Sequence, residues 1–292
     1  MDKVLLLGAG GQLGQLVARV MSGRSALTAC THDDLDITDA DAVRKKINEV
    51  APTTIINTAA YTAVDLAESN QEQAFRVNRD AVKFLAEAAP DTTRIVHIST
   101  DFVFSKNRKT PYLPGDVPDP VSMYGKSKLA GEQALLAHHR TNAVIVRASW
   151  LYSAKGQNFL TTMLRLMANM ESVMVVNDQH GSPTSAYTLA EVVSRMALAK
   201  AAEGIFHWSD NGVTTWYDFA VEIQRQALEL GILDRKIAIY PVATSEYKAV
   251  KATRPAYSAL DSTSTEEILA VQTLPWRDQL HDVLLKYKEE HS

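Results

Sequence analysis

The sequence predicts an α/β fold, in which a doubly wound parallel sheet is followed by a smaller C-terminal lobe. Short apolar runs rich in β-branched residues alternate with longer amphipathic stretches through the first half of the chain. A glycine-rich turn follows the first apolar run immediately and opens a helical pattern. With 292 residues the chain has room for two units. We expect a ligand-binding domain over residues 1–150 and mainly a substrate-binding lobe over 151–292, from which short segments can return to the first domain.

The predicted strands and helices alternate in the first half. We expect strands at residues 3–8, 26–31, 54–58, 94–98 and 143–148. Helical patterns between them cover residues 12–22, 39–49, 70–89 and 122–139. In such a sheet the ligand crevice lies at the carboxyl ends of the strands, so functional residues are expected just after each strand.

The second half is less regular. It contains strand-like runs at Val173–Val176 and Ile205–Trp208, and helical patterns at about 188–200, at about 216–230 and after Pro275. We interpret these segments as a lobe laid over the crevice. Two further segments, 104–121 and 243–262, are predicted to be long loops, and both a substrate loop and a mobile surface excursion are compatible with them.

The composition excludes several classes of protein. With 30 basic and 34 acidic residues, the net charge of −4 leaves no polybasic field for nucleic acid or an anionic membrane. No stretch approaches the roughly 18 apolar residues of a membrane span, and the first apolar run is too short for a secretion signal. A single cysteine, Cys30, rules out an intramolecular disulfide and a cysteine-based zinc framework. We therefore expect a cytoplasmic protein.

The glycine turn predicts a nucleotide site. Gly8, Gly11 and Gly14 stand three residues apart between the first strand and the first helix. Without side chains, the backbone can turn tightly, approach a pyrophosphate and pack the helix against the strand, while the helix N-terminus offers free N–H groups. An ordinary tight turn is the alternative, but the strand–turn–helix context favours a Rossmann-type dinucleotide site.

The end of the second strand leaves the choice of cofactor open. Thr31 is neutral where an NAD-preferring fold would usually offer an acid to the ribose 2′-hydroxyl, although Asp33 and Asp34 follow. No arginine stands nearby in the sequence to bind a 2′-phosphate. Asp36-Ile37 come next, and they are suited either to hydrogen-bond and cover an adenine or to form the cap region of the following helix.

A candidate catalytic group follows the fourth strand. Thr100 stands at the end of that strand, while Tyr124 and Lys128, four residues apart at the start of a helix, share one face. An ammonium beside a phenol lowers the phenol pKa from about 10 toward neutral, as a proton donor to a forming alkoxide requires. The same ammonium can hold a nicotinamide ribose, and Thr100 can donate a hydrogen bond to the reacting carbonyl oxygen.

A second tyrosine–lysine pair serves as an internal comparison. Tyr247 and Lys251 have the same spacing but lie outside the first half, beside a predicted loop, with no serine or threonine strand end before them. Context therefore favours Tyr124 and Lys128 over this pair, and over the interpretation of Tyr124 and Lys128 as an ordinary exposed helical pair.

Several multi-residue motifs occur in one order along the chain: Gly8–Gly14, Asn57–Asp65, Ser99–Phe104 and Tyr124–Glu132. Together they resemble the extended short-chain dehydrogenase/reductases and, more narrowly, the dTDP-4-dehydrorhamnose reductases. Further matches extend the resemblance over nearly the whole chain, at Arg147–Tyr152, Asn177–Thr184, Thr214–Phe219 and Arg254-Pro255.

This resemblance implies the roles of the site residues. Together with the glycine pattern it assigns NAD(P)H binding to Gly8, Gly11, Gln12, Leu13, Gly14, Asp36, Ile37, Ala60, Tyr61, Thr62, Tyr124 and Lys128. It implies substrate contacts at Thr100, Asp101 and Trp150, and catalysis by Thr100, Tyr124 and Lys128. An indole after the fifth strand can cover a sugar face, while core packing is the other role open to Trp150. Gln15 stands where metal-using relatives carry an acidic ligand, so we expect no metal.

The function implied is reduction of the C4 ketone of dTDP-4-dehydro-6-deoxy-L-mannose to dTDP-L-rhamnose by NADPH or NADH. The expected partner is a nucleotide-sugar, without nucleic acid or membrane, and a homodimer is compatible with the sequence. The alternatives are a reductase giving a talose-type 6-deoxysugar, a sugar-nucleotide epimerase or dehydratase, and a non-catalytic nucleotide-binding regulatory subunit. Dehydratases of this kind usually place a second acid directly after Asp101, where this chain has Phe102.

Overall fold

The computed structural model describes residues 2–106, 108–139, 141–247 and 251–291. Its centre is a six-stranded sheet with the order β10-β5-β4-β3-β1-β2, in which every neighbouring pair runs parallel. These strands are β1 (Lys3–Leu7), β2 (Ala26–Cys30), β3 (Thr54–Asn57), β4 (Arg94–Thr100), β5 (Ala143–Ala148) and β10 (Gly204–Trp208). The inner strands are almost entirely buried, which accounts for their short apolar runs, such as Val4–Leu7 in β1 and Ala143–Val146 in β5. The predicted α/β fold is confirmed.

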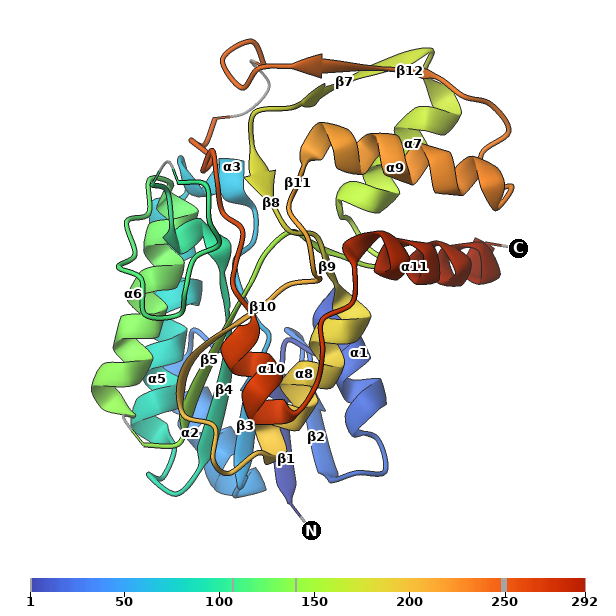
Figure 1. The fold of residues 1–292 in the computed structure, drawn as a ribbon. Coiled ribbons are helices and arrows are strands. Elements are labelled where there is room, and N and C mark those ends of the chain that lie inside the picture. Colours follow the sequence, from blue (N-terminus) through green and yellow to red (C-terminus); the bar gives the residue numbers. More distant parts are fainter. Residues whose placement is uncertain (1, 107, 140, 248–250, 292) are drawn as a thin grey trace.

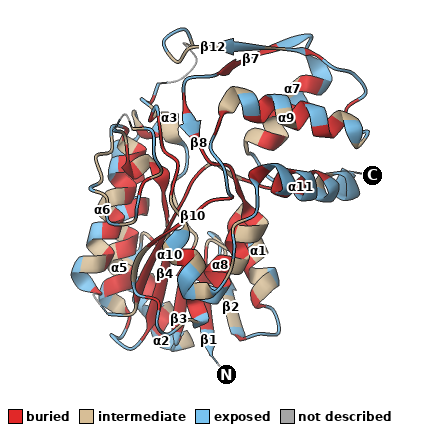
Figure 2. Ribbon diagram, in the orientation of Figure 1, coloured by how far each residue is buried: buried red, intermediate tan, exposed pale blue. Residues whose placement is uncertain are grey.

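Helices cover both faces of this sheet (Figure 1). One layer consists of α1 (Gln12–Met21) and α8 (Ala186–Leu198), and the other of α2 (Ala40–Val50), α5 (Ala81–Ala88) and α6 (Met123–His138). Apolar side chains such as Val17 and Leu189 pack the first layer against the sheet, and Ile47 and Leu85 pack the second. Figure 2 shows buried residues along the central strands and on the inward sides of the helices. No described helix is both long and apolar enough to cross a membrane.

The predicted helix over residues 70–89 has a break in its middle. α4 (Gln71–Phe75) leads into a π-helical turn, η1 (Arg76–Asp80), before α5 begins. This turn brings the backbone of Asn78 so close to α6 that a Cβ at Gly131 would lie 3.2 Å from the Asn78 carbonyl carbon and closer still to its oxygen. Single π turns often occur at functional sites, because they redirect one side chain.

Two segments of the second half return to the first domain. The predicted helix near 188–200 is α8, and the predicted strand Ile205–Trp208 is β10, which pairs with β5 at the edge of the sheet. Their expected place in the lobe over the crevice is therefore corrected. Parallel strands are joined by long crossovers, so the partner of β10 cannot be identified from neighbouring residues. The boundary at residue 150 remains a prediction.

Most of the rest of the second half forms a separate layer above the sheet edge, while α10 (Thr263–Leu269) packs against β10 and α8 (Figure 1). This layer contains α7 (Phe159–Asn169), α9 (Trp216–Glu229), α11 (Trp276–His291) and the parallel pair β7 (Ser172–Val176) and β12 (Ala238–Val242). Their shared core includes Leu164, Phe219 and Trp276. The predicted helix near 216–230, the final helix and the strand at 173–176 are confirmed, whereas α7 and β12 were not predicted. The remaining short elements are α3 (Val64–Ala67), η2 (Asp101–Val103), β6 (Leu151–Tyr152), β8 (His180–Gly181), β9 (Thr184–Ser185), β11 (Thr214–Thr215) and α10 (Thr263–Leu269).

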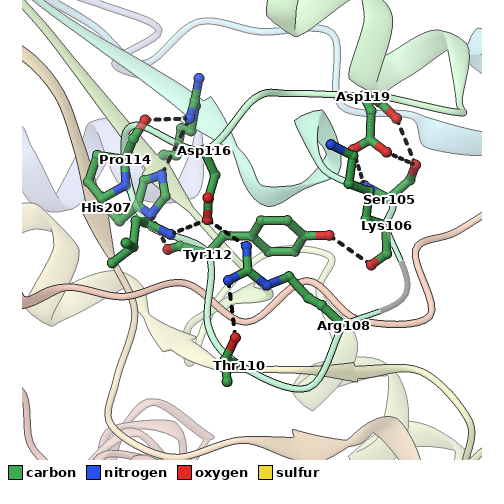
Figure 3. A network of polar contacts seen from close by, with 11 residues as sticks. Ser105, Lys106, Arg108, Thr110, Tyr112, Pro114, Asp116, Asp119 and His207 are labelled. Carbon is green, nitrogen blue, oxygen red and sulfur yellow. Dashed lines mark hydrogen bonds and ion pairs between the residues drawn. The ribbon is translucent and has the colours of Figure 1, made fainter.

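The predicted loop over 104–121 is anchored to the rest of the chain. The Tyr112 ring stacks on Phe104 with centroids 4.1 Å apart, and the Tyr112 backbone forms a bridge with Leu260. Arg108 pairs with Asp116 at 2.6 Å beside it (Figure 3). Its described part therefore packs against the second predicted loop instead of extending freely into solvent.

Parts of these two loops lie outside the described residues. They are residue 107 of the first loop and residues 248–250 of the second.

Candidate active site

One cleft of about 1030 Å³ lies at the carboxyl ends of the central strands and extends to the lobe. Its lining includes every residue assigned above to cofactor, substrate or catalysis: Gly8, Gly11, Gln12, Leu13, Gly14, Asp36, Ile37, Ala60, Tyr61, Thr62, Thr100, Asp101, Tyr124, Lys128 and Trp150. The structure thus brings together residues that are up to 142 positions apart. Their functional roles remain predictions.

The three glycines of the first turn differ in why the structure favours glycine at each position. Gly8 has φ +76°, and a Cβ there would lie 2.6 Å from the backbone nitrogen of Ala59. A Cβ at Gly14 would lie 2.8 Å from the carbonyl carbon of Gly8, so both positions exclude a side chain by packing alone. A Cβ at Gly11 would meet only the Gly8 oxygen, at 3.4 Å. The fold itself therefore tolerates a side chain at Gly11, at the N-terminus of α1, where an anion would approach.

The residues after β2 are fixed by short local hydrogen bonds. Asp34 accepts from the Thr31 backbone nitrogen at 2.8 Å and from its hydroxyl at 2.7 Å. Asp36 accepts from Thr38 in the same way, and these bonds lower the pKa of Asp36. The cap of α2 is Asp39, which accepts from the first-turn N–H groups at 3.0 Å. Asp36 is therefore not needed as a helix cap, and its place in the cleft lining favours the ligand-binding interpretation.

Sequence reasoning missed a cation at this end of the cleft. Arg76, on the π turn η1, lines the cleft, and its charge adds to the Thr38 hydrogen bonds that lower the pKa of Asp36. Only the tertiary structure places Arg76 there, because it follows β3, a different strand from the one that supplies Thr31.

Asn78 is a second residue that the sequence did not reveal. Its side chain accepts from the Tyr61 backbone nitrogen at 2.8 Å and donates to the Tyr61 carbonyl at 3.0 Å. It also donates to the Ser127 hydroxyl at 2.9 Å. Asn78 therefore ties the loop after β3 to α6, and so fixes the cleft wall that contains Tyr61.

The catalytic tyrosine predicted from the sequence lies at the start of α6. Ser122 caps this helix by accepting from the Gly125 backbone nitrogen at 3.1 Å. Burial raises the pKa of Tyr124 to about 12, and a hydrogen bond with Thr100 lowers it only in part. The expected lowering of this pKa by Lys128 is therefore wrong for this structure. The Lys128 side chain is directed elsewhere, because Nζ donates to the Ile98 carbonyl of β4 at 2.7 Å.

Burial also shifts the two charged neighbours of Tyr124. It lowers the pKa of Lys128 to about 8, against a partial opposing effect of the Glu132 charge. It raises the pKa of Asp101 to about 7, although hydrogen bonds from Ser258 and Thr100 act in the other direction. The Thr100 hydroxyl donates to the Asp101 carboxylate at 3.1 Å. Strongly shifted pKa values in a cleft are typical of active sites.

A pair of tryptophans forms the lobe side of the cleft. Trp150 and Trp216 are stacked with ring centroids 3.5 Å apart and an angle of 8° between the planes. Trp150 has φ +45°, and the backbone of Gly181 lies against its indole, where a Cβ would come within 2.7 Å of the ring nitrogen. Both indoles line the cleft, so Trp150 is more than a core residue. Trp216 was not predicted as part of the site.

The comparison pair takes no part in the cleft. Neither Tyr247 nor Lys251 is among the lining residues, and the Lys251 backbone nitrogen donates to Asp65 at 2.9 Å. Arg254, which does line the cleft, pairs with the same carboxylate at 2.8 Å.

Known proteins resemble this chain in sequence and fold over most or nearly all of its length. A dTDP-4-dehydrorhamnose reductase of Aggregatibacter actinomycetemcomitans is 37% identical over 291 residues, with 97% of this chain and 98% of the relative covered. A dTDP-4-keto-6-deoxy-D-glucose reductase of Streptomyces niveus is 41% identical over 222 residues, covering 75% of this chain and 76% of the relative. The crystal structure of dTDP-4-dehydrorhamnose reductase from Bacillus anthracis in complex with NADP superposes with a TM-score of 0.90 at 32% identity, and covers 98% of this chain and 99% of that chain.

The family model described as RmlD substrate binding domain matches residues 2–289. Since that match spans nearly every residue and the relatives above share more than 30% identity with this chain, the chain belongs to the RmlD substrate binding domain family.

Proposed function

We propose that this protein reduces the C4 ketone of dTDP-4-dehydro-6-deoxy-L-mannose to dTDP-L-rhamnose, with NADPH or NADH as the cofactor. The observation that carries this proposal is that Thr100, Tyr124 and Lys128 line the same cleft as the glycine turn. A nucleotide-binding turn and a proton-donating group in one cleft are what a nicotinamide-dependent ketone reduction needs. Relatives bearing the name of this reaction match the chain from end to end.

The residues of the cleft fit a dinucleotide. The side-chain-free surface at Gly11 and the N-terminus of α1 suit the pyrophosphate, as Gln12 and Leu13 supply the first helical N–H groups. Asp36 and Ile37, which line the cleft after β2, suit the adenosine end, while Ala60, Tyr61 and Thr62 line the wall after β3. When bound, the nicotinamide supplies the hydride that is added to C4.

The side chains around C4 supply the proton. Tyr124 is a neutral phenol at neutral pH, because burial holds its pKa at about 12, and its proton is available as charge develops on the ketone oxygen. Thr100 can turn its hydroxyl proton from the Asp101 carboxylate to the same oxygen and donate a hydrogen bond there. Lys128, with its pKa lowered to about 8, is a stronger acid than Tyr124 and can return a proton to the phenolate once Nζ turns from the Ile98 carbonyl toward it. The order of these pKa values makes that return favourable.

The substrate is placed against the lobe. The stacked indoles of Trp150 and Trp216 offer an apolar face to a hexose ring. Asp101, half-protonated near neutral pH because burial raises its pKa to about 7, can donate to or accept from a sugar hydroxyl.

The alternatives differ in specific residues. Phe102 occupies the position of the second acid expected of a dehydratase, lines the cleft and packs edge-on against Tyr124 with ring centroids 5.6 Å apart. An apolar ring there cannot shuttle a proton, which argues against dehydration. A different 6-deoxysugar product needs only a changed orientation of the hexose. The relative named as a dTDP-4-keto-6-deoxy-D-glucose reductase supports that alternative.

The decisive experiment is incubation of the purified protein with dTDP-4-dehydro-6-deoxy-L-mannose and each nicotinamide cofactor. We expect oxidation of the cofactor and a product with the rhamno configuration by NMR. A talo product would select the alternative reductase, and no oxidation would indicate a non-catalytic subunit. A homodimer and a cytoplasmic location remain predictions, to be tested by light scattering and by cell fractionation.

A further inference from the structure

Behind Lys128, a buried chain of polar groups joins β3 to α6. His97 of β4 and Asn57 of β3 are fully buried, Lys128 is 1% exposed, and neither His97 nor Asn57 lines the cleft. Asn57 Nδ2 lies 3.1 Å from His97 Nδ1, and His97 Nε2 lies 3.3 Å from Lys128 Nζ. His97 therefore contacts both Asn57 and Lys128, and all three side chains are shielded from bulk water.

Asn57 determines which nitrogen of His97 carries the proton. The Asn57 Oδ1 accepts from the Ala59 backbone nitrogen at 3.1 Å, so its Nδ2 is the atom that faces the ring. An amide N–H group can only donate, so His97 Nδ1 must accept, and the proton of the neutral ring sits on Nε2. The ring stays neutral because burial, the larger effect, holds the pKa of His97 well below its ordinary value, and the ammonium form of Lys128 acts in the same direction.

The Nε2–H group then points at Lys128. Lys128 Nζ also donates to the Ile98 carbonyl at 2.7 Å. An ammonium has only donors, whereas a neutral amine has a lone pair that accepts the N–H of His97. The contact at 3.3 Å therefore favours the amine form of Lys128.

The other charged groups around Lys128 do not cancel this preference. Glu132, one turn along α6, favours the ammonium, but Arg147 of β5 binds its carboxylate at 2.9 and 2.6 Å and Ser99 of β4 at 2.5 Å. On the other side, Tyr124 is a neutral phenol, and the charge of Asp101 on η2 acts on Tyr124.

A second buried histidine has the opposite arrangement beside a cation. His207 Nδ1 lies 2.9 Å from the Tyr112 carbonyl oxygen, which can only accept, so this ring carries its proton on Nδ1 (Figure 3). Its Nε2 faces Arg147 Nη1 at 3.4 Å and can accept from the guanidinium. His207 thus offers Arg147 a lone pair, whereas His97 offers Lys128 an N–H group.

We propose that His97 is a positioning residue for the reduction: with its proton fixed on Nε2 by Asn57, it weakens the hold of Lys128 on its third proton, so that Lys128 can give that proton up and regain it during turnover. A lysine with the ordinary pKa of about 10.4 would keep that proton throughout the neutral range. The role rests on the proposed function, because it is the return of a proton to Tyr124 that needs a lysine of this kind.

The tautomers can be read directly in the wild-type protein. In protein with ¹⁵N-labelled histidine, NMR at pH 7.5 distinguishes a protonated ring nitrogen from an unprotonated one, and the variants His97→Gln and His207→Gln assign the signals. We expect His97 to carry its proton on Nε2 and His207, the internal control, on Nδ1. A His97 proton on Nδ1, or an imidazolium, would overturn the proposal whatever the activity. The expected tautomer in a protein without reductase activity would instead count against the proposed function alone.

An isosteric variant tests the effect on Lys128. In Asn57→Asp the carboxylate accepts from both Ala59 and His97, which moves the ring proton to Nδ1 and offers Lys128 a lone pair. We expect the basic limb of the pH profile of kcat/KM to move up by roughly one to two pH units. Asn70→Asp, at an exposed asparagine, is the charge control and should leave the profile unchanged. His97→Gln, whose amide oxygen can also face Lys128, should move the limb in the same direction if Asn57→Asp does not fold. An unmoved basic limb in the folded variants would refute the proposal.

Discussion

Replacing Gly14 or Gly11 with alanine should separate the packing role of the glycine turn from its ligand-binding role. A Cβ at Gly14 would lie 2.8 Å from the Gly8 carbonyl carbon and 2.9 Å from the Ala9 Cα, and closer still to the Gly8 oxygen. All of these are backbone atoms between β1 and α1, so no side chain can rotate away. A Cβ at Gly11 meets the Gly8 oxygen at 3.4 Å, and its backbone angles, φ −76° and ψ 163°, suit any residue.

The expected magnitudes follow from these separations. The Gly14 contacts fall at least about 0.5 Å short of ordinary van der Waals distance, so we expect the upper end of the overpacking range, about 3 kcal/mol of lost stability. For a chain of this size that lowers Tm by roughly 6 °C. Gly11→Ala should change stability by less than about 0.5 kcal/mol. Its methyl group lies where the pyrophosphate must approach, so NADPH affinity should fall at least about tenfold, which corresponds to about 1.4 kcal/mol.

Two measurements on both variants check this reasoning. Thermal unfolding gives Tm, and titration calorimetry gives the Kd for NADPH. An unchanged Tm in Gly14→Ala would refute the packing argument. Wild-type NADPH affinity in Gly11→Ala would reduce the glycine run to an ordinary turn.

Further predictions concern the catalytic tyrosine, cofactor choice and pH. Tyr124→Phe should lower kcat by a factor of roughly 10²–10⁴ with cofactor affinity nearly intact. In the control variant Tyr247→Phe, kcat should stay within a few-fold of the wild-type value. Equal losses of kcat in steady-state kinetics would contradict the choice of Tyr124 over Tyr247. The N–H and hydroxyl of Thr31 both donate to Asp34, so we expect NADPH to be accepted at least as readily as NADH and Thr31→Asp to shift the ratio of kcat/KM toward NADH. A strong NADH preference before the substitution would assign the ribose end to Asp34 instead. Burial raises the pKa of Asp210 to about 7, whereas an unfolded aspartate has a pKa near 4. Between these pH values the folded state therefore binds a proton that the unfolded state has released. The stability that this proton contributes is lost as pH rises from about 4 to about 7. Asp210→Asn should therefore weaken the dependence of Tm on pH across that window, leaving the part due to Asp101, whose pKa is also raised to about 7; an unaltered curve would refute the assignment to Asp210.

Some of the residues that meet in the cleft could be predicted from the sequence, and others could not. Strand ends and a local turn place Gly8, Thr100 and Tyr124 at one edge of a parallel sheet, because that edge gathers the carboxyl ends of the strands. Trp216 and Arg76 follow no such rule. Trp216 reaches the cleft by stacking on Trp150, and Arg76 through a π turn in a stretch predicted as continuous helix.

By itself, the sequence determined the parallel α/β fold, the glycine turn and the cleft positions of Thr100, Tyr124 and Lys128. These depend on local periodicity and on the fixed geometry of parallel strands, both of which neighbouring residues encode. Only the tertiary structure decided that β10 completes the sheet, and that burial raises the pKa of Tyr124. It also decided that Lys128 turns toward His97. Protonation and side-chain direction depend on what excludes water and on which donors and acceptors meet, and those partners come from distant parts of the chain.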